Sequence, residues 1–147
     1  STKFRNNDLN DTPSSGISFS GTDFPLYRLS DVYLMFAECA VRGASNASMS
    51  DALNYVNMVR NRASASTITM ADLDLDFIID ERGRELNLEG HRRTDLIRFG
   101  RFTGGNYLWP WKGNTAGGAS IPDAYNLFPI PQSALDANPN LQQNTGY

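Results

Sequence analysis

The chain is short of the residues that build cross-links, metal sites and membrane spans. It has a single cysteine, Cys39, so an intramolecular disulfide is impossible. Its single histidine, His91, has no second imidazole or nearby thiolate with which to share a structural zinc ion. No stretch approaches the ~20 consecutive apolar residues of a transmembrane helix. We therefore expect no metal, and we expect Cys39, which lies in an apolar helical run, to be a buried structural thiol.

Positive charge is also scarce. The chain has 13 lysines and arginines against 16 aspartates and glutamates, which gives a net charge of −3. No overall basic field exists to attract nucleic acid or anionic lipid. The EF-hand loop, the phosphate-cradling glycine loop and the nucleophile elbow are absent as well. We expect neither a nucleic-acid partner nor a cofactor.

Helical periodicity is what the chain does have. After a polar segment, 1–23, which we expect to be irregular, apolar residues recur at helical spacing from Leu29 to Ala40, and Gly43 provides a stop. A capping box at Ser48 predicts a second helix. The same signature at Thr69 predicts the longest helix, running to about Glu89. Residues 24–102 are thus predicted to be helical, and the fold class is mainly α.

Residues 103–147 are predicted to be loop-rich. From Thr103 to Asn126 no helical or strand period survives, and glycine, proline, tryptophan and tyrosine are frequent. Unstructured stretches of that length in a compact domain are usually functional or packed onto a neighbour. Ser133 is expected to open one further helical turn, which Asn138 and Pro139 end.

Acids and arginines alternate from Asp80 to Phe102. The Glu81–Glu85 and Glu85–Glu89 spacings are repulsive on a helix, so the helix needs cations from outside, and arginines beyond Gly90 are the nearest candidates. We also expect another backbone to lie close to Gly83, which is costly inside a helix. Because every acid has an arginine nearby, a structural role is favoured over general acid–base catalysis. We predict no catalytic residue and one partly buried ion network of Arg82, Arg84, Glu85, Arg92 and Asp95.

The aromatic loop is the better candidate for a ligand site. Tryptophan and tyrosine rings stack on the flat C–H faces of sugars, while amides and charges bind the hydroxyls. In the alternative interpretation, Trp109 and Trp111 fill gaps in the fold on either side of Pro110. The candidate ligand-binding residues are Tyr107, Trp109, Trp111, Lys112 and Asn114, with Tyr125 and Asn126 nearby.

Short motifs follow one another in a distinctive order. They are Arg28 with Ala37–Glu38, Asn57 with Arg60 and Arg62–Ala63, Glu81–Arg82 with Arg84–Glu85–Leu86, Glu89–Gly90 with Arg92, Asp95–Leu96 with Arg98, Pro129–Ile130–Pro131, and Asn138–Pro139–Asn140. Together with the ending Gln143–Asn144 and Gly146–Tyr147, this ordered set resembles the C-terminal part of the SusD/RagB family. Thr145 stands where that family usually has a proline, a departure that affects only the tail.

The resemblance implies a SusD-like helical fold with a tetratricopeptide-like helix hairpin and long irregular loops. Residues 1–147 would be the C-terminal portion, with the remainder of the protein and a lipid anchor upstream. The protein would bind oligosaccharide without catalysis at the surface of the bacterial outer membrane and deliver it to a SusC-like TonB-dependent transporter. The alternative is a tetratricopeptide-type protein-interaction scaffold that binds no glycan. A glycoside hydrolase ranks third.

Overall fold

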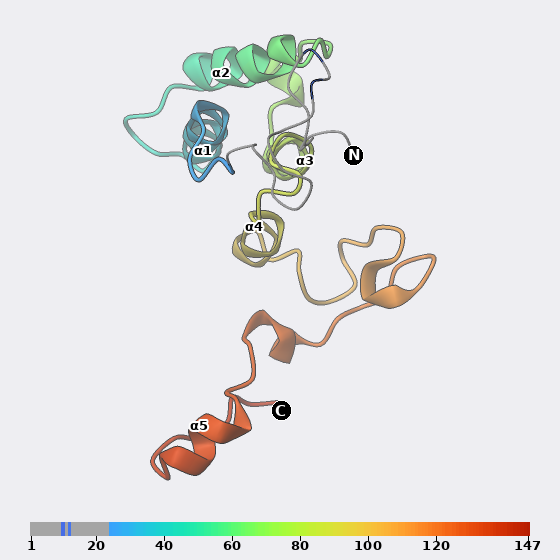
Figure 1. Ribbon diagram of the computed structural model, residues 1–147. Coiled ribbons are helices and arrows are strands. Elements are labelled where there is room, and N and C mark those ends of the chain that lie inside the picture. Colours follow the sequence, from blue (N-terminus) through green and yellow to red (C-terminus); the bar gives the residue numbers. More distant parts are fainter. Residues whose placement is uncertain (1–9, 11, 13–23) are drawn as a thin grey trace. The chain divides into compact units, whose positions relative to one another are not determined.

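The computed structural model describes residues 10, 12 and 24–147 (Figure 1). The expectation for 1–23 therefore lies almost entirely outside the described residues. The chain divides into two compact units, Ser1–Arg92 and Arg93–Tyr147. Each unit is treated by itself below.

The described residues of the first unit form three α-helices. They are α1 (Leu29–Val41), α2 (Met49–Arg62) and α3 (Leu75–Glu85), and α1 packs against both of the others. Ser48 caps α2 by accepting a hydrogen bond from the Asp51 backbone N–H, as its sequence predicts. The fully buried core consists of Leu34, Ala37, Ala52, Val56, Ile78 and Ile79.

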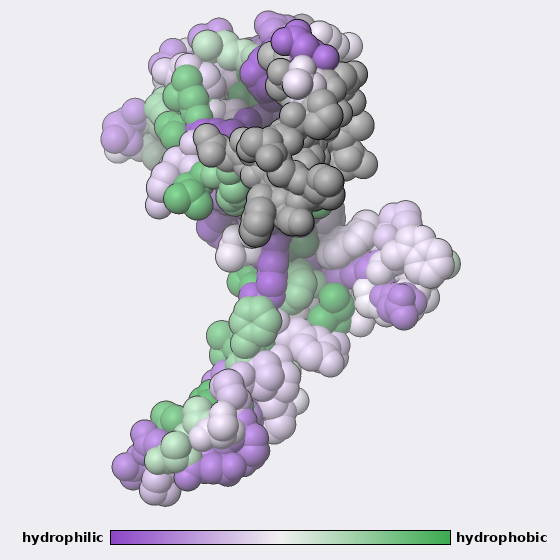
Figure 2. Space-filling model, in the orientation of Figure 1, coloured by the Kyte–Doolittle hydropathy of each residue, from purple (hydrophilic) through white to green (hydrophobic). Residues whose placement is uncertain are grey.

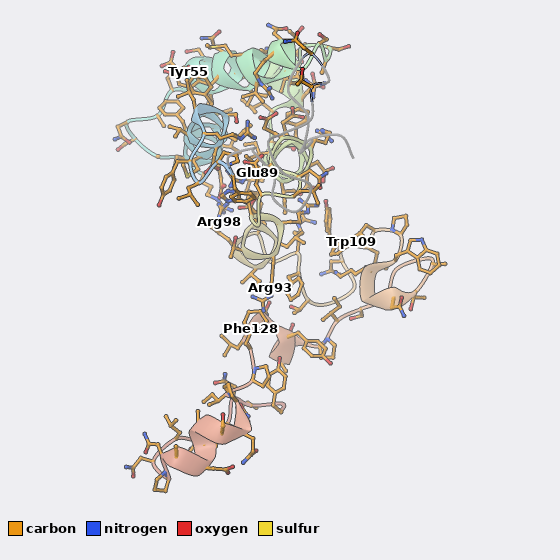
Figure 3. The ribbon with its side chains drawn as sticks, viewed as in Figure 1. Tyr55, Glu89, Arg93, Arg98, Trp109 and Phe128 are labelled. Carbon is orange, nitrogen blue, oxygen red and sulfur yellow. The ribbon has the colours of Figure 1, made fainter. Side chains whose placement is uncertain are left out.

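Aromatic rings hold the hairpin of α1 and α2 together. The Tyr33 and Tyr55 rings stack with their centroids 4.6 Å apart, and Phe36 meets the Tyr55 ring edge-on at 5.1 Å. Tyr55 is marked in Figure 3. Such pairs add about 0.5–1.5 kcal/mol each to the burial of their surface. The predicted helix hairpin is therefore present and fixed by named contacts.

The helix predicted from Thr69 to Glu89 is interrupted. The Thr69–Asp72 capping box is formed, but it closes only a 3₁₀ turn, η1 (Met70–Asp72). Leu73 is then extended, and α3 begins after Asp74, whose carboxylate accepts the Phe77 backbone N–H at 2.7 Å. The Asp74 side chain thus competes with the continuation of the helix from η1, because it binds a backbone N–H itself. The 3₁₀ turn therefore ends before Asp74. The longest described helix is consequently α2, with 14 residues.

Cys39 is exposed, so the prediction of a buried thiol is wrong. The buried side of α1 carries Leu34 and Ala37, which face α2 and α3. Cys39 instead follows Val32 and Met35 at helical spacing, and both of these are exposed. Figure 2 shows hydrophobic groups on the surface over this part of the chain. The apolar residues of α1 outnumber the positions on its buried face. Cys39 was predicted to be buried because it belongs to this apolar run.

The second unit is mostly irregular. It holds nearly all of α4 (Arg92–Arg98), the 3₁₀ turns η2 (Lys112–Asn114) and η3 (Asp123–Asn126), and α5 (Gln132–Ala137). A single antiparallel bridge joins Gly104 and Ile121. The helical turn predicted at Ser133 is confirmed as α5, which ends at Asn138 as expected. With no strand among the described residues, the mainly α fold class is confirmed.

Candidate functional site

A layer of ion pairs ties the helices of the first unit together. Arg28, which precedes α1, donates to Glu85 Oε1 at 2.7 Å and makes two bonds to the Glu89 carboxylate, at 2.7 and 2.8 Å. Arg62 of α2 donates to the other Glu85 oxygen at 2.7 Å. Glu85 is thus held between two arginines from different elements, and Figure 3 labels Glu89, the other partner of Arg28.

The charges in this layer are fixed by their partners. Burial alone would raise the pKa of the Glu85 carboxyl, but the Arg28 hydrogen bond and the Arg62 charge outweigh it and lower that pKa. The bond to Glu89 raises the pKa of Arg28, against the opposing effect of its own burial. The Glu85 carboxylate is therefore ionised and engaged, which is the arrangement of a structural layer.

Three further pairs extend the layer along α3. Arg60 of α2 and Arg84 each bind Glu81 Oε2 at 2.7 Å. Arg82, which is buried, donates to Asp31 of α1 at 2.7 Å. Between them these contacts connect α3 with both α1 and α2.

The structure thus gives the predicted ion-network residues partners that the sequence did not indicate. Arg82, Arg84 and Glu85 lie in the layer, and the cations that compensate the glutamates include Arg28 and Arg62, which lie upstream of α3. Asp95 pairs with Arg98 at 2.8 Å in the second unit. That all the predicted residues form one connected network stays a prediction. In the sequence, only the family resemblance drew attention to three of the arginines in this layer, Arg28, Arg60 and Arg62.

Arg92 occupies the space beside Gly83. Its Nη1 donates to the Ile79 carbonyl at 2.7 Å, and a Cβ at position 83 would lie 2.8 Å from the same nitrogen. The close approach predicted at Gly83 is therefore made by a side chain, not by another backbone.

The Tyr107–Asn114 loop of the second unit is organised around Lys112. This residue is 1% exposed, and its Nζ donates to the backbone carbonyls of Tyr107 at 2.7 Å and Arg101 at 3.3 Å. The ammonium also lies 4.8 Å from the centre of the Trp109 ring, and burial lowers its pKa. The Lys112 charge therefore holds the loop from inside, and a direct contact of Lys112 with ligand stays a prediction.

Of the other predicted residues of this loop, some are half-buried and others are exposed. Trp109, marked in Figure 3, is half-buried, with its ring 5.9 Å from that of Tyr107. Trp111 is 68% exposed, and Asn114 is exposed too. The packing interpretation therefore does not fit Trp111, whereas it does fit Trp109.

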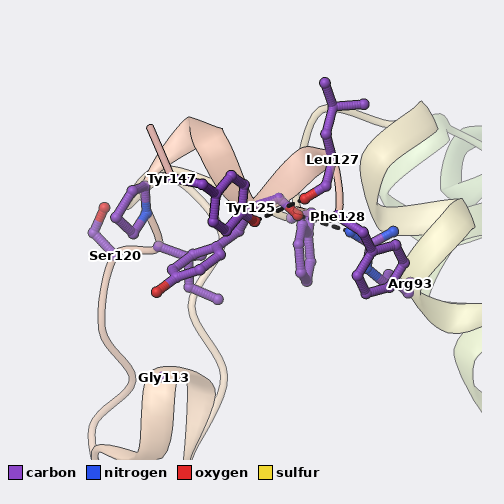
Figure 4. Close-up of a pocket in the computed structure, with 10 residues that line it drawn as sticks. Arg93, Gly113, Ser120, Tyr125, Leu127, Phe128 and Tyr147 are labelled. Atoms are coloured by element: carbon purple, nitrogen blue, oxygen red, sulfur yellow. Dashed lines mark hydrogen bonds between the residues drawn. The ribbon is translucent and has the colours of Figure 1, made fainter. Parts of the chain in front are cut away.

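A second feature of this unit is an aromatic cleft of about 440 Å³ (Figure 4). Its volume falls within the range of small-ligand sites. Of the residues that line this cleft, the sequence analysis named only Tyr125 near a ligand site, because the others are spread from the start of α4 to the last residue. Its lining includes Arg93, Phe102, Ser120, Tyr125, Leu127, Phe128 and Tyr147.

No group of three or more histidine, cysteine, aspartate or glutamate side chains among the described residues could hold a metal ion. Among them there is also no helix with the length and apolar character to cross a bilayer.

Comparisons with known proteins place this chain. The family model described as the SusD family matches residues 1–147. The starch-binding protein SusD of Bacteroides thetaiotaomicron is 41% identical over 149 residues, which cover 99% of this chain and 25% of that protein. Surface glycan-binding protein A from the same organism superposes with a TM-score of 0.71 at 34% identity, over 92% of this chain and 27% of that one.

A structure of that glycan-binding protein in complex with laminarihexaose gives a TM-score of 0.70 at 34% identity, with the same coverage. The chain therefore spans about a quarter of the length of the curated relative and of the solved proteins that it matches. The likeness is too close and too nearly complete over this chain to reflect a shared helical hairpin alone. The chain belongs to the SusD family.

Proposed function

We propose that this chain is the C-terminal portion of a non-catalytic glycan-binding lipoprotein at the surface of a bacterial outer membrane, which delivers oligosaccharide to a SusC-like TonB-dependent transporter. The observation that carries the proposal is the 41% identity to a starch-binding protein over 99% of the chain. The likeness to a glycan-binding protein solved with laminarihexaose supports the same ligand class.

The state of the acids supports binding without hydrolysis. A glycosidase needs two carboxyl groups across its substrate, one of them with a raised pKa so that it can donate a proton. Here Glu81, Glu85 and Glu89 are paired with arginines, and the pKa of Glu85 is lowered. A carboxyl group with a lowered pKa, such as that of Glu85, is a poor proton donor at neutral pH.

The Tyr107–Asn114 loop supplies a proposed sugar platform. Trp111 offers an exposed ring, and the Asn114 amide lies three residues away on the same tight turn. Lys112 and Trp109 hold that turn from beneath. In this proposal Trp111 and Asn114 contact the glycan, while Tyr107, Trp109 and Lys112 position them.

Affinity gels with starch, laminarin, xylan and host glycans test the proposal in the full-length protein. We expect retarded migration with at least one polysaccharide and no release of reducing ends from any of them. Reducing ends that appear with the wild type and vanish in Glu85→Gln would overturn the non-catalytic assignment. Recovery of a TonB-dependent transporter with the protein from outer-membrane extracts tests the proposed partner.

A protein-interaction scaffold is the second candidate, and one observation favours it. Leu29, Val32 and Met35 are exposed along α1, and a shallow cavity of about 200 Å³ lies between α1 and α2, lined by Leu29, Tyr33 and Met58 among others. A protein that binds an apolar peptide and leaves every glycan of the panel unretarded would support this alternative.

A further inference from the structure

The aromatic cleft is rimmed by rings that are exposed but not free to move. Tyr125, Phe128 and Tyr147 expose 50%, 71% and 44% of their surface. The Tyr125 and Tyr147 rings meet edge to face with their centroids 6.1 Å apart. The Tyr147 hydroxyl donates to the Leu127 carbonyl at 2.8 Å, a bond drawn in Figure 4. The last residue of the chain is thereby tied to the wall of the cleft.

Arg93 fixes the opposite side. Its guanidinium lies 4.1 Å from the centre of the Phe128 ring and 5.1 Å from that of Phe102. One of its nitrogens donates to the backbone carbonyls of Tyr125 at 2.7 Å and Asn126 at 3.3 Å. A cation held by two rings and two carbonyls keeps the aromatic wall in place before any ligand arrives, which reduces the entropy lost on binding.

The lining identifies the class of ligand. None of the ten lining side chains is acidic, so the cleft offers no side-chain carboxylate to a cation. Its one positive charge is already engaged by the two rings and the carbonyls, which makes it a weak anion site. What remains are ring faces beside the hydroxyls of Ser120 and Tyr125. A neutral ring with one apolar face and a polar rim matches that surface, and a pyranose is such a ring.

We propose that this cleft is a second glycan subsite, which adjoins the Tyr107–Asn114 loop at Gly113 and holds a neutral pyranose against Tyr125 and Tyr147. The subsite rests on the proposed glycan-binding function. It adds to that function the position of a binding site and a preference for uncharged sugars. Uronic acids and sulfated sugars would gain little affinity from their charge in this cleft, because the Arg93 guanidinium already binds the Tyr125 carbonyl and the Phe128 ring.

Two variants of the full-length protein test the cleft. Tyr125→Ala removes a ring but keeps both backbone carbonyls that Arg93 binds. Ser120→Trp fills the cleft from an exposed position without removing any of the wall contacts described above. Tyr27→Ala is the matched control, because Tyr27 is 91% exposed and lies in the first unit. Maltohexaose and laminarihexaose serve as calorimetric probes, and thermal melting confirms that each variant is folded.

We expect Tyr125→Ala to weaken binding of the better hexaose about five- to tenfold, as for the loss of one stacking partner. Ser120→Trp should weaken it at least as much, while Tyr27→Ala should match the wild type. Wild-type affinity in both cleft variants would overturn the subsite, and the proposed function would stand. A protein partner would then be the alternative occupant of the cleft. A wild-type protein that binds neither these hexaoses nor any polysaccharide of the panel would overturn both proposals.

Discussion

At the scale of single residues, the glutamates share one environment. The chain has four glutamates, and all of them, Glu38, Glu81, Glu85 and Glu89, are buried and paired with arginine. Removing one partner of a buried pair leaves the other charge uncompensated, which costs about 3–5 kcal/mol. We expect Glu85→Gln to lower the free energy of unfolding by that order in urea titrations. Asp123→Asn, an exposed and equally isosteric change, is the control and should be nearly neutral.

The pH dependence of that loss follows from the sign of the pKa shift. The pKa of Glu85 is lower in the folded state, so its ionised form favours folding. Its contribution is complete above the ordinary glutamate pKa of about 4.3 and is lost as pH falls through the folded-state value. The wild type should therefore lose stability on acidification more steeply than Glu85→Gln. Parallel pH profiles for the two proteins would contradict this account.

Lys112 gives a second residue-scale prediction. Lys112→Met keeps most of the buried volume but leaves the Tyr107 and Arg101 carbonyls without their donor, at about 1–3 kcal/mol for each buried group. We expect a lower melting temperature and faster hydrogen exchange across 101–115. Unchanged stability with abolished glycan affinity would instead support the direct ligand contact that the sequence predicted.

At the scale of elements, α3 and Arg92 should be energetically coupled. Alanine normally stabilises a helix interior by about 1 kcal/mol relative to glycine. At Gly83, however, the new Cβ would meet the Arg92 guanidinium, which the Ile79 carbonyl holds in place. We expect Gly83→Ala to destabilise the wild type and to stabilise an Arg92→Ala background. The two effects, read from urea titrations as a double-mutant cycle, should differ by at least about 1 kcal/mol. Equal effects in both backgrounds would show that Arg92 does not fill this space.

Local signals in the sequence predicted the elements well where a cap or a proline marks them. Ser48 begins α2 and Asn138 ends α5, because a side-chain cap and a following proline act within one turn. The break between η1 and α3 at Leu73–Asp74 was not predicted. Thr69 and Asp74 each cap a helical element, and the prediction placed a single helix start at Thr69. Periodicity also could not say which apolar side of α1 is buried, and so Cys39 was misplaced.

Partners distant in sequence were the least predictable part of the candidate site. Arg28 lies 57 and 61 positions from Glu85 and Glu89, and no local rule connects them. The cleft likewise joins Arg93 to Phe128 and Leu127 to Tyr147, contacts that only the folded chain creates. The Tyr107–Asn114 loop was found because its residues are neighbours, but the inward direction of Lys112 has no sequence signal.

At the scale of the whole molecule, the two tryptophans should separate stability from ligand binding. Trp109 is half-buried against Tyr107 and the Lys112 ammonium, so Trp109→Ala should cost up to about 3 kcal/mol of stability, below the full value for a buried aromatic. Trp111 is 68% exposed, and Trp111→Ala should change stability by less than about 0.5 kcal/mol.

Glycan binding should respond in the opposite order. An exposed ring that anchors a ligand typically contributes more than about 1 kcal/mol, so Trp111→Ala should weaken binding roughly tenfold in calorimetric titrations of the full-length protein. Trp109→Ala should retain affinity in the fraction that stays folded, apart from any loosening of the turn that carries Trp111. Thermal melting run beside the titrations separates the two effects. If Trp111→Ala binds every glycan as the wild type does, the loop is not a platform, and the cleft at Tyr125 remains as the proposed contact of this portion with glycan.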